Sequence, residues 1–374
     1  MPEPFRVAFL MDQVAGHITN YRNLQRAAEH DATLDASWWE ISSYRPDGRL
    51  EQFQQRFHSV VPSYVTGNAR AVMEIRGALR GGACDAVFTN ARAAVLLSRR
   101  FAQVPTMVDF DVTPLQLDEL DGYGSHADPQ PVAWLKRRLA TDFYRSATLL
   151  QAWSTWAAAS AVNDYGVPED KVVVNPPGVD LDFWRRRGDR SPAQARPQVL
   201  FVGGDFRRKG GDLLLDLQAE RGDFDLHVVT REPVAPAPGV TVYDDVEPNT
   251  DRLRSLYHRA DAFVLPSRSE CFGLATVEAM AAGLPVITSD VGGAADIVDH
   301  GRNGYLTPAG DRVQLGLALD ALLTDGARRR AMGARSRQLA EQRFDLLRNA
   351  ARTFGHLKRL ARAGTAATPA SKAS

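Results

Sequence analysis

The chain has 374 residues, of which 44% are hydrophobic and 24% are charged. This length predicts two domains, each with its own core. The 45 basic and 45 acidic residues give no net charge, so no electrostatic footprint for nucleic acid is present. The chain has two cysteines, Cys84 and Cys271, and this small number excludes a disulfide framework or a cysteine-rich metal site. No apolar run reaches transmembrane length, and we expect a cytoplasmic protein, with peripheral contact at the inner face of a membrane left open.

The N-terminal residues show the opening of a Rossmann-like half. Residues 5–11 are an apolar run that predicts a buried strand, and a helix is expected from about Thr19. Gly16 and His17 lie between them, at the carboxyl end of the strand, where open α/β sheets bind ligands. A loop histidine that only caps local backbone fits equally well. The Gly-x-Gly-x-x-Gly spacing is absent, which argues against a dinucleotide cofactor.

Two aspartates, Asp109 and Asp111, end the strand expected over 104–110. Paired carboxylates of this spacing can clamp a divalent ion on a diphosphate, but Asp180 and Asp182 repeat the spacing, and nothing else indicates a metal site. We therefore expect Asp109 or Asp111 to hydrogen-bond a substrate, with a structural turn as the alternative.

A helix is predicted over 131–146, with Trp134 and Leu135 on an apolar face and Lys136 to Arg138 opposite. It could meet anionic lipid as an interfacial helix. The favoured interpretation is a helix packed on the sheet with a solvated basic face, because residues 1–177 carry a small net negative charge.

A glycine-rich basic loop opens the second half of the chain. A strand is predicted over 198–202, and the loop at 203–211 follows it. Gly204 permits close approach of a ligand, and Arg207, Arg208 and Lys209 can neutralise a departing anion. The loop is no Walker P-loop, because no Ser or Thr follows Lys209 where that motif requires it. A solvated basic turn is the alternative.

The most informative stretch is Ser267 to Gly293, with the apolar run at 262–265 that precedes it. Together they predict a strand, a polar loop, a helix and another strand in succession. The first amides of this helix, at Phe272, Gly273 and Leu274, carry the positive end of the helix dipole and can bind phosphate. Glu278, about a turn inside the helix, can accept from a ribose diol, and Glu270 lies where a sugar would follow. A diphosphate between a ribose and a sugar is a nucleotide sugar. The alternative is an ordinary βαβ unit with two surface glutamates.

This stretch resembles the nucleotide-sugar site of the retaining glycosyltransferases of family four, which have the GT-B fold. The resemblance covers almost the whole chain and is strongest over 198–310. It implies an α/β protein with two Rossmann-like domains that face each other across a cleft. The implied units are an acceptor-binding domain over 1–177, a nucleotide-sugar-binding domain over 178–344, a helix over 345–362 that returns to the first domain, and a disordered tail over 363–374.

The resemblance implies transfer of a sugar from a UDP- or GDP-linked donor to a hydroxyl of a small-molecule, glycan or lipid-linked acceptor. It implies retention at the anomeric carbon, with no cofactor and no metal. Lys209 matches the family lysine that holds the diphosphate; the family arginine follows the strand glycine, where Gly204 stands here, so we expect Arg208 or Arg207 to replace it. The open alternatives are a non-catalytic nucleotide-sugar-binding subunit and a nucleotide-sugar epimerase of the same fold.

The expected site has a catalytic set and a donor-binding set. Thr230 and Arg231 follow the strand over 224–229, where the nucleobase would lie, and Cys271 is expected to be a small filler and not a catalytic thiol. The expected catalytic residues are Glu270, Lys209, Arg208, His17 and Asp109, and the expected donor-binding residues are Gly16, Gly204, Arg207, Arg208, Lys209, Thr230, Arg231, Glu270, Cys271, Phe272, Gly273, Leu274 and Glu278.

Overall fold

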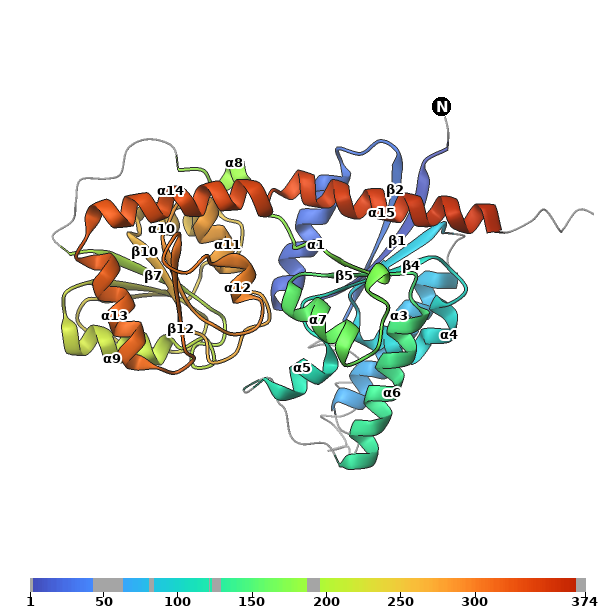
Figure 1. Cartoon of the computed structure of the whole chain (residues 1–374), viewed down its shortest axis with the longest axis horizontal. Coiled ribbons are helices and arrows are strands. Elements are labelled where there is room, and N and C mark those ends of the chain that lie inside the picture. The colour runs from blue at the N-terminus through green and yellow to red at the C-terminus, as the bar shows by residue number, and fades with distance from the viewer. Residues whose placement is uncertain are drawn as a thin grey trace, which may run out of the picture.

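The computed structural model describes residues 3–42, 63–80, 84–120, 122, 129–186 and 196–367. These residues form two domains side by side, each built on a six-stranded parallel sheet with helices packed against it (Figure 1). The predicted α/β architecture of two Rossmann-like domains is confirmed. No helix in the described ranges is both long and apolar enough to cross a lipid bilayer.

The first sheet has the strand order β2-β1-β3-β4-β5-β6. Every neighbouring pair is parallel, so the carboxyl ends of all these strands lie at one edge. The strands are β1 (Phe5–Asp12), β2 (Leu34–Ile41), β3 (Ala86–Thr89), β4 (Thr106–Phe110), β5 (Leu149–Ala152) and β6 (Val172–Val174).

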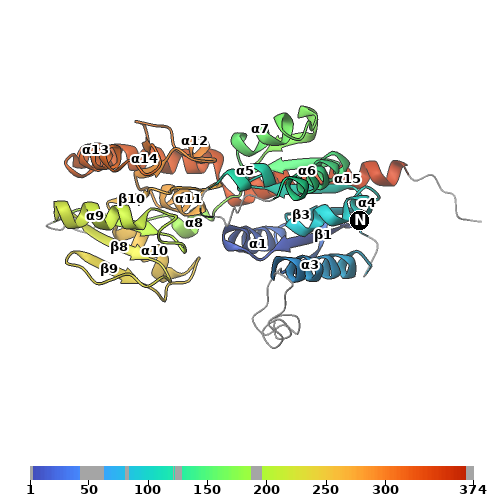
Figure 2. The ribbon, with the colours of Figure 1, turned by 90° about the horizontal axis from the view of Figure 1, so that it is seen from below.

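Both faces of the first sheet are covered, because successive side chains of a strand point to opposite faces. Along β1, Ala8 and Leu10 belong to one apolar cluster and Phe9 belongs to another. Figure 2 shows helices on either side of this sheet. The helical segments of the first domain are α1 (Ala15–Ala28), α3 (Ser63–Arg80), the 3-10 turn η1 (Arg92–Leu97), α4 (Ser98–Phe101), α5 (Pro114–Glu119), α6 (Gln130–Ser146), α7 (Thr155–Asn163) and the 3-10 turn η2 (Glu169–Lys171).

The second sheet has the strand order β12-β11-β10-β7-β8-β9, again with parallel neighbours. Its strands are β7 (Gln198–Val202), β8 (Asp225–Val229), β9 (Val240–Tyr243), β10 (Ala262–Leu265), β11 (Val286–Ser289) and β12 (Gly304–Thr307). Its helices are α8 (Leu181–Trp184), α9 (Gly211–Arg221), α10 (Asp251–Arg259), α11 (Leu274–Ala281), α12 (Ala294–Ile297), α13 (Arg312–Leu323) and α14 (Gly326–Arg343).

The last helix, α15 (Leu346–Ala367), crosses back onto the first domain, as predicted (Figure 1). Its buried residues Leu346, Ala350, Phe354, Leu357 and Ala361 recur every three or four positions, and they join the apolar cluster of β1 and β3. The helix runs past the predicted end at residue 362, into the segment predicted to be a disordered tail. Alanine favours helix, and Gly364 packs against the ring of Pro105. Residues 368–374 of that tail lie outside the described residues.

One local prediction was wrong at the carboxyl edge of the first sheet. The helix α1 begins at Ala15 and not near Thr19, so Gly16 and His17 lie in its first turn and not in a loop. Asn90 follows the end of β3, and η1 begins after Ala91 without a side-chain cap. The Asn90 side chain instead accepts from the Asp12 backbone N–H at 2.7 Å, across neighbouring strands.

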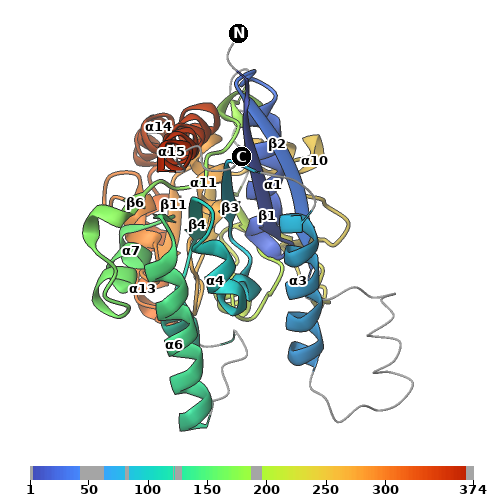
Figure 3. The same ribbon diagram turned by 90° about the vertical axis from the view of Figure 1, so that its right-hand side faces the viewer.

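The helix α6 differs from the favoured prediction over its first half. Its C-terminal half packs on the domain through Ala140, Phe143 and Tyr144. Its N-terminal half projects away from the sheet (Figure 3), so the side chains of Trp134 and Leu135 are 61% and 49% exposed. The apolar face predicted from the sequence is therefore continuous in the helix but buried only where the sheet supports it.

Candidate active site

Two loops meet at the carboxyl edge of the second sheet. One joins β7 to α9 and carries the basic residues, and the other joins β10 to α11. Gly210 has a φ of +75°, and a Cβ on it would lie 2.1 Å from the carbonyl oxygen of Pro266. The Arg268 backbone N–H also donates to the carbonyl of Arg208 at 2.8 Å. Close backbone contact therefore fixes one loop on the other, and glycine is required at the contact.

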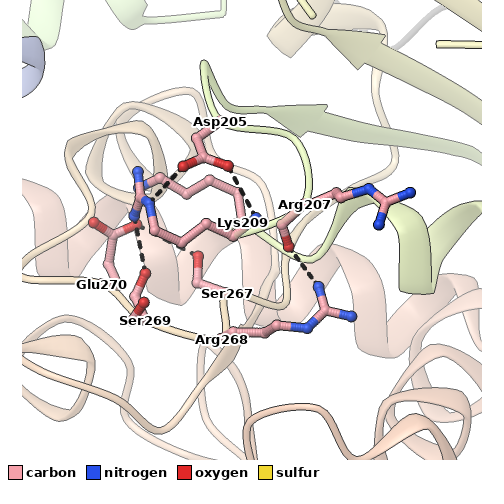
Figure 4. Close-up of polar contacts among 8 residues, drawn as sticks. Asp205, Arg207, Lys209, Ser267, Arg268, Ser269 and Glu270 are labelled. Atoms are coloured by element: carbon pink, nitrogen blue, oxygen red, sulfur yellow. Dashed lines mark hydrogen bonds and ion pairs between the residues drawn. The ribbon is translucent and has the colours of Figure 1, made fainter. Parts of the chain in front are cut away.

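Lys209 and Glu270 form an ion pair between these loops, and Figure 4 shows the two side chains converging. Both are largely enclosed, with 16% and 11% of the side chains exposed. The Ser267 hydroxyl lies 3.4 Å from the same Glu270 oxygen. The structure thus brings together the predicted cation of the β7 loop and the predicted carboxylate of the β10 loop.

The side chains of Arg208 and Arg207 differ in their surroundings. The Arg208 guanidinium donates to the Asp205 carboxylate at 2.9 Å and to the Ser269 carbonyl at 3.1 Å. Its aliphatic stem lies against Gly122 of the first domain. The Arg207 side chain is exposed and points away from Lys209 (Figure 4). Of the two arginines expected from the sequence, the structure places Arg208 at the junction of the loops and the facing domain. Gly204 is exposed, and space is open around its Cα.

The start of α11 is fixed by glycines on the neighbouring segment. Gly273 precedes the helix with a φ of +94°. Gly292 has a φ of +56°, and a Cβ on it would lie 2.0 Å from the carbonyl oxygen of Glu270. The Gly293 backbone N–H donates to the carbonyl of Cys271 at 2.9 Å. Cys271 is buried, which fits the filler role. The helix therefore presents its first N–H groups next to Glu270, as an anion site requires.

Glu278 lies inside α11 and is only 6% exposed. The Tyr257 hydroxyl donates to its Oε2 at 3.1 Å. Burial raises the pKa of Glu278 to about 7, although the Tyr257 hydrogen bond lowers it. This carboxyl group therefore changes charge close to neutral pH.

The two residues expected at the nucleobase differ in their surroundings. Thr230 is buried, and its hydroxyl accepts from the Glu232 backbone N–H at 3.3 Å. Arg231 forms an ion pair with Glu247 that is largely exposed on both sides. Thr230 is thus part of the end of β8, while Arg231 belongs to the surface.

His17 and Asp111 form the polar centre of the first domain. The His17 Nε2 lies 3.3 Å from Asp111 Oδ1, and the Asn90 amide donates to His17 Nδ1 at 2.8 Å. Burial lowers the pKa of His17, but the carboxylates of Asp111, Asp109 and Asp12 outweigh this effect and raise it. Because the Asn90 amide donates to Nδ1, the neutral imidazole carries its proton on Nε2. Nε2 therefore donates to Asp111 in the neutral and in the charged form of the ring.

Asp109 was expected to hydrogen-bond the sugar or the acceptor, but the structure shows protein donors at both oxygens of its carboxylate. It is 1% exposed, and both carboxylate oxygens already accept hydrogen bonds: Gln151 donates at 2.8 Å and the Trp153 indole at 2.9 Å. Burial raises its pKa to about 6, against these two hydrogen bonds. Asp109 therefore positions Trp153, and Asp111 is the aspartate beside His17.

The two half-sites face each other at the domain boundary. The Trp153 ring packs edge-on against Phe272, with centroids 5.8 Å apart. A Cβ on Gly16 would lie 3.5 Å from a methyl group of Leu274. Phe272 thus contacts the first domain and is also part of the α11 start. Gly16, which was expected to bind the donor, lies opposite that start.

Sequence reasoning missed four contributors to this arrangement: Gln151, Trp153, Tyr257 and Asp296. The Asp296 carboxylate accepts from the Thr155 hydroxyl of the other domain at 2.8 Å. Gln151 and Trp153 sit at the carboxyl end of β5, so the strand-end rule that singled out Asp109 was a usable signal for them. Over the described residues, no group of three or more His, Cys, Asp or Glu side chains is arranged to hold a metal ion.

Comparison with known families and proteins matches both halves of the chain. The model described as Glycosyltransferase Family 4 matches residues 14–183, and that described as Glycosyl transferases group 1 matches residues 240–339. A D-inositol 3-phosphate glycosyltransferase of Pseudarthrobacter chlorophenolicus is 33% identical over 199 residues, which cover 47% of each chain. One of Nocardia farcinica is 34% identical over 208 residues, 48% of this chain and 46% of the relative. The chain spans about half the length of the curated relatives it matches.

Solved structures share the fold over almost the whole chain. Sucrose-phosphate synthase from Thermosynechococcus elongatus superimposes with a TM-score of 0.77 at 18% identity, covering 96% of this chain and all of that one. Anabaena Alr3699/HepE in complex with UDP-glucose gives a TM-score of 0.67 at 18% identity, covering 94% and 99%. Both domains and their relative placement therefore have counterparts among known structures.

Proposed function

Because the chain belongs to the family-four glycosyltransferases and has the GT-B fold, we propose that it transfers a sugar from a nucleoside-diphosphate sugar to an acceptor hydroxyl, with retention of the anomeric configuration. One observation carries this proposal. Lys209, Glu270 and the start of α11 converge at the edge of the second sheet, opposite His17 and Asp111 of the first. UDP- and GDP-linked sugars are the proposed donors.

The donor wall, defined as Arg208, Lys209, Glu270, Glu278 and the first turn of α11, acts on the leaving group. As the bond between the anomeric carbon and the diphosphate oxygen breaks, negative charge grows on the diphosphate. The Lys209 ammonium, the Arg208 guanidinium and the α11 amides stabilise that charge. The acceptor oxygen attacks from the face that the diphosphate leaves, and its proton passes to a departing phosphate oxygen, so no protein base is required.

The two glutamates of the wall bind the parts of the donor on either side of the diphosphate. Ionised Glu278 accepts from the ribose hydroxyls, with Tyr257 holding its other oxygen in place. Glu270, fixed by Lys209, faces the transferred sugar and supports positive charge at its anomeric carbon. Thr230 borders the nucleobase.

The proposed reaction is independent of metal ions, because protein cations take the charge of the diphosphate. The hydrogen bonds of the two aspartates support this proposal: Asp109 accepts from Gln151 and Trp153, and Asp111 lies beside His17. A chelator should leave turnover unchanged.

The experiment combines three readouts on the intact protein. A thermal-shift panel of UDP-, GDP- and ADP-sugars identifies the donor, because binding to the folded state raises the melting temperature. Nucleotide release is then followed with and without an acceptor mixture and a chelator, and the anomeric configuration of the product is read by proton NMR. Inversion, or loss of turnover with the chelator, contradicts the mechanism. Binding without release indicates a non-catalytic subunit, and conversion of donor without acceptor indicates an epimerase; either result overturns the proposal.

We also propose peripheral contact of α6 with anionic lipid. Three adjacent exposed apolar side chains, Val132, Trp134 and Leu135, lie beside Lys136, Arg137 and Arg138 on the projecting end of this helix (Figure 3). The wild type should co-sediment with anionic vesicles and only weakly with neutral vesicles. The Trp134→Ser variant should co-sediment less with anionic vesicles than the wild type does. Equal sedimentation of the wild type with neutral vesicles contradicts this contact.

A further inference from the structure

A cavity of about 320 Å³ opens in the first domain beside the polar centre. It lies between the end of β4, η1, α5 and α6. This volume is within the usual range of small-molecule sites, about 300–1,000 Å³. Most of its lining is apolar, and representative wall residues are Ala93, Val95, Val112, Leu117, Leu139 and Phe143.

The polar lining residues fall into two groups by their exposure. His17, Asn90 and Asp109 are buried, and Asp111 is mostly enclosed, so they form the inner end. Asn68, Arg92, Asp118 and Lys136 are exposed. The Arg92 charge helps to lower the pKa of Asp111, so this cation acts on the inner end. The rest of the lining is apolar except for the buried residues Thr113 and Tyr144.

The inner end is the part of the cavity closest to the donor wall. The His17 ring lies 5.0 Å from the ring of Trp153, which in turn contacts Phe272 at the start of α11. Gly16, next to His17, faces Leu274. A hydroxyl group held at this inner end would therefore be the part of a bound molecule nearest the transferred sugar.

The chemistry of the walls selects what can fill the cavity. A polyol or a phosphate placed along Val95, Leu139 and Phe143 would lose its hydration without gaining hydrogen bonds there, which is costly. An aliphatic or aryl group would gain free energy from burial. The contact of Asp111 with His17 uses the oxygen Oδ1. The carboxylate of Asp111 has further lone pairs, with which it can accept a hydrogen bond from a hydroxyl group at the inner end.

Resting on the proposed function, we propose that this cavity is the acceptor site and that the acceptor is an alcohol on an apolar body. The hydroxyl binds at Asp111 and His17, and the body lies along the walls. This acceptor class differs from the inositol phosphate in the names of the curated relatives. The specificity comes from residues of η1, α5 and α6, outside the donor wall.

The test compares two probes on the intact protein saturated with the donor's nucleoside diphosphate. Calorimetric titration with 1-octanol should show saturable binding with a negative heat-capacity change, and D-inositol 3-phosphate should bind at least about tenfold more weakly. With the nucleotide sugar as donor, 1-octanol should be glycosylated. Tighter binding of D-inositol 3-phosphate, or 1-octanol binding without transfer, overturns the inference.

Variants locate the binding. Leu139→Asp and Leu117→Asn, on two different helices of the wall, should each weaken 1-octanol binding at least about tenfold while the donor dissociation constant stays unchanged. Met73→Asp is the matched control, because Met73 is exposed on α3 and does not line the cavity. Wild-type affinity for 1-octanol in both wall variants overturns the inference. If the wild type binds no nucleotide sugar at all, the proposed function itself fails, which is a separate result.

Discussion

The two sheets of this protein have the same number of strands and the same parallel arrangement, but their facing edges carry opposite chemistry. The second edge presents cations and the positive end of α11. The first presents carboxylates, a histidine and an apolar cavity. In the proposed reaction this difference divides the work: the second edge stabilises the leaving anion, and the first edge holds the nucleophile.

The edges also differ in how their side chains are fixed. On the second edge, Gly210, Gly292 and Gly293 let backbone segments touch, so the loops are fixed by main-chain contact. On the first, a chain of side-chain hydrogen bonds runs from Asp109 through Gln151 to Thr353 of α15. The returning helix is thereby connected to the acceptor half of the site.

The largest expected effect is on the second edge. Lys209→Ala removes a cation that stabilises the departing diphosphate, so acceptor-dependent turnover should fall about 10²–10³-fold. Arg207→Ala is the control, because that side chain is exposed and points away, and it should change turnover less than about threefold. Equal losses in the two variants would contradict the assignment of the diphosphate to Lys209.

A backbone substitution tests the main-chain contact. Gly292→Ala puts a methyl group 2.0 Å from the Glu270 carbonyl at a positive φ, so the free energy of unfolding should fall by about 3 kcal/mol or more. Gly301→Ala is the matched control, because Gly301 also has a positive φ, +75°, but open space around it. Its free energy of unfolding should fall by about 1 kcal/mol. Chemical denaturation measures both, and equal losses would show that the contact is not tight.

On the first edge, Asp111→Asn should raise the acceptor KM about tenfold, because an amide replaces a charged acceptor of the hydroxyl. The donor dissociation constant should not change, since the variant leaves the second edge intact. Asp142→Asn, on the exposed side of α6, serves as the control for loss of a charge. A weaker donor affinity in Asp111→Asn would mean that the first edge also holds the donor.

The last prediction concerns pH, and its smallest part is the shift of a titration midpoint. A raised pKa of about 7 means that Glu278 is protonated below neutrality, and a protonated carboxyl is a poorer acceptor for a ribose diol. Donor affinity should therefore be constant above pH 7 and fall about tenfold per unit below it. In Tyr257→Phe the hydrogen bond that lowers this pKa is gone, so the midpoint should move up by less than about one unit. The donor dissociation constant is measured from pH 5 to 9 for the wild type and for Tyr257→Phe. The same midpoint in both proteins would contradict the role of Tyr257.

The difference between the edges also explains what the sequence could predict. Ser267–Gly293 and the loop at 203–211 are local motifs, so Lys209, Glu270 and the α11 start could be located from these motifs and their resemblance to the family. The first edge is assembled from residues at distant positions, such as His17, Asn90 and Asp111, and only the sheet brings them together. Spacing gave no reason to choose Asp111 over Asp109, because the choice depends on Gln151 and Trp153.

The exposure of the first half of α6 could not be predicted from the sequence either. Periodicity showed an apolar face that includes Trp134 and Leu135, and periodicity alone says nothing about where the supporting sheet ends. The packing of Ala140 and Phe143 shows that the support reaches only the second half of the helix.

The most direct test of the division between the edges is the dissociation constant of the donor's nucleoside diphosphate, measured by calorimetry for the wild type, Glu278→Ala and Asp111→Asn. If the second edge holds the donor, Glu278→Ala weakens binding at least about tenfold and Asp111→Asn leaves it unchanged. Unchanged binding in Glu278→Ala, together with weaker binding in Asp111→Asn, would contradict the account.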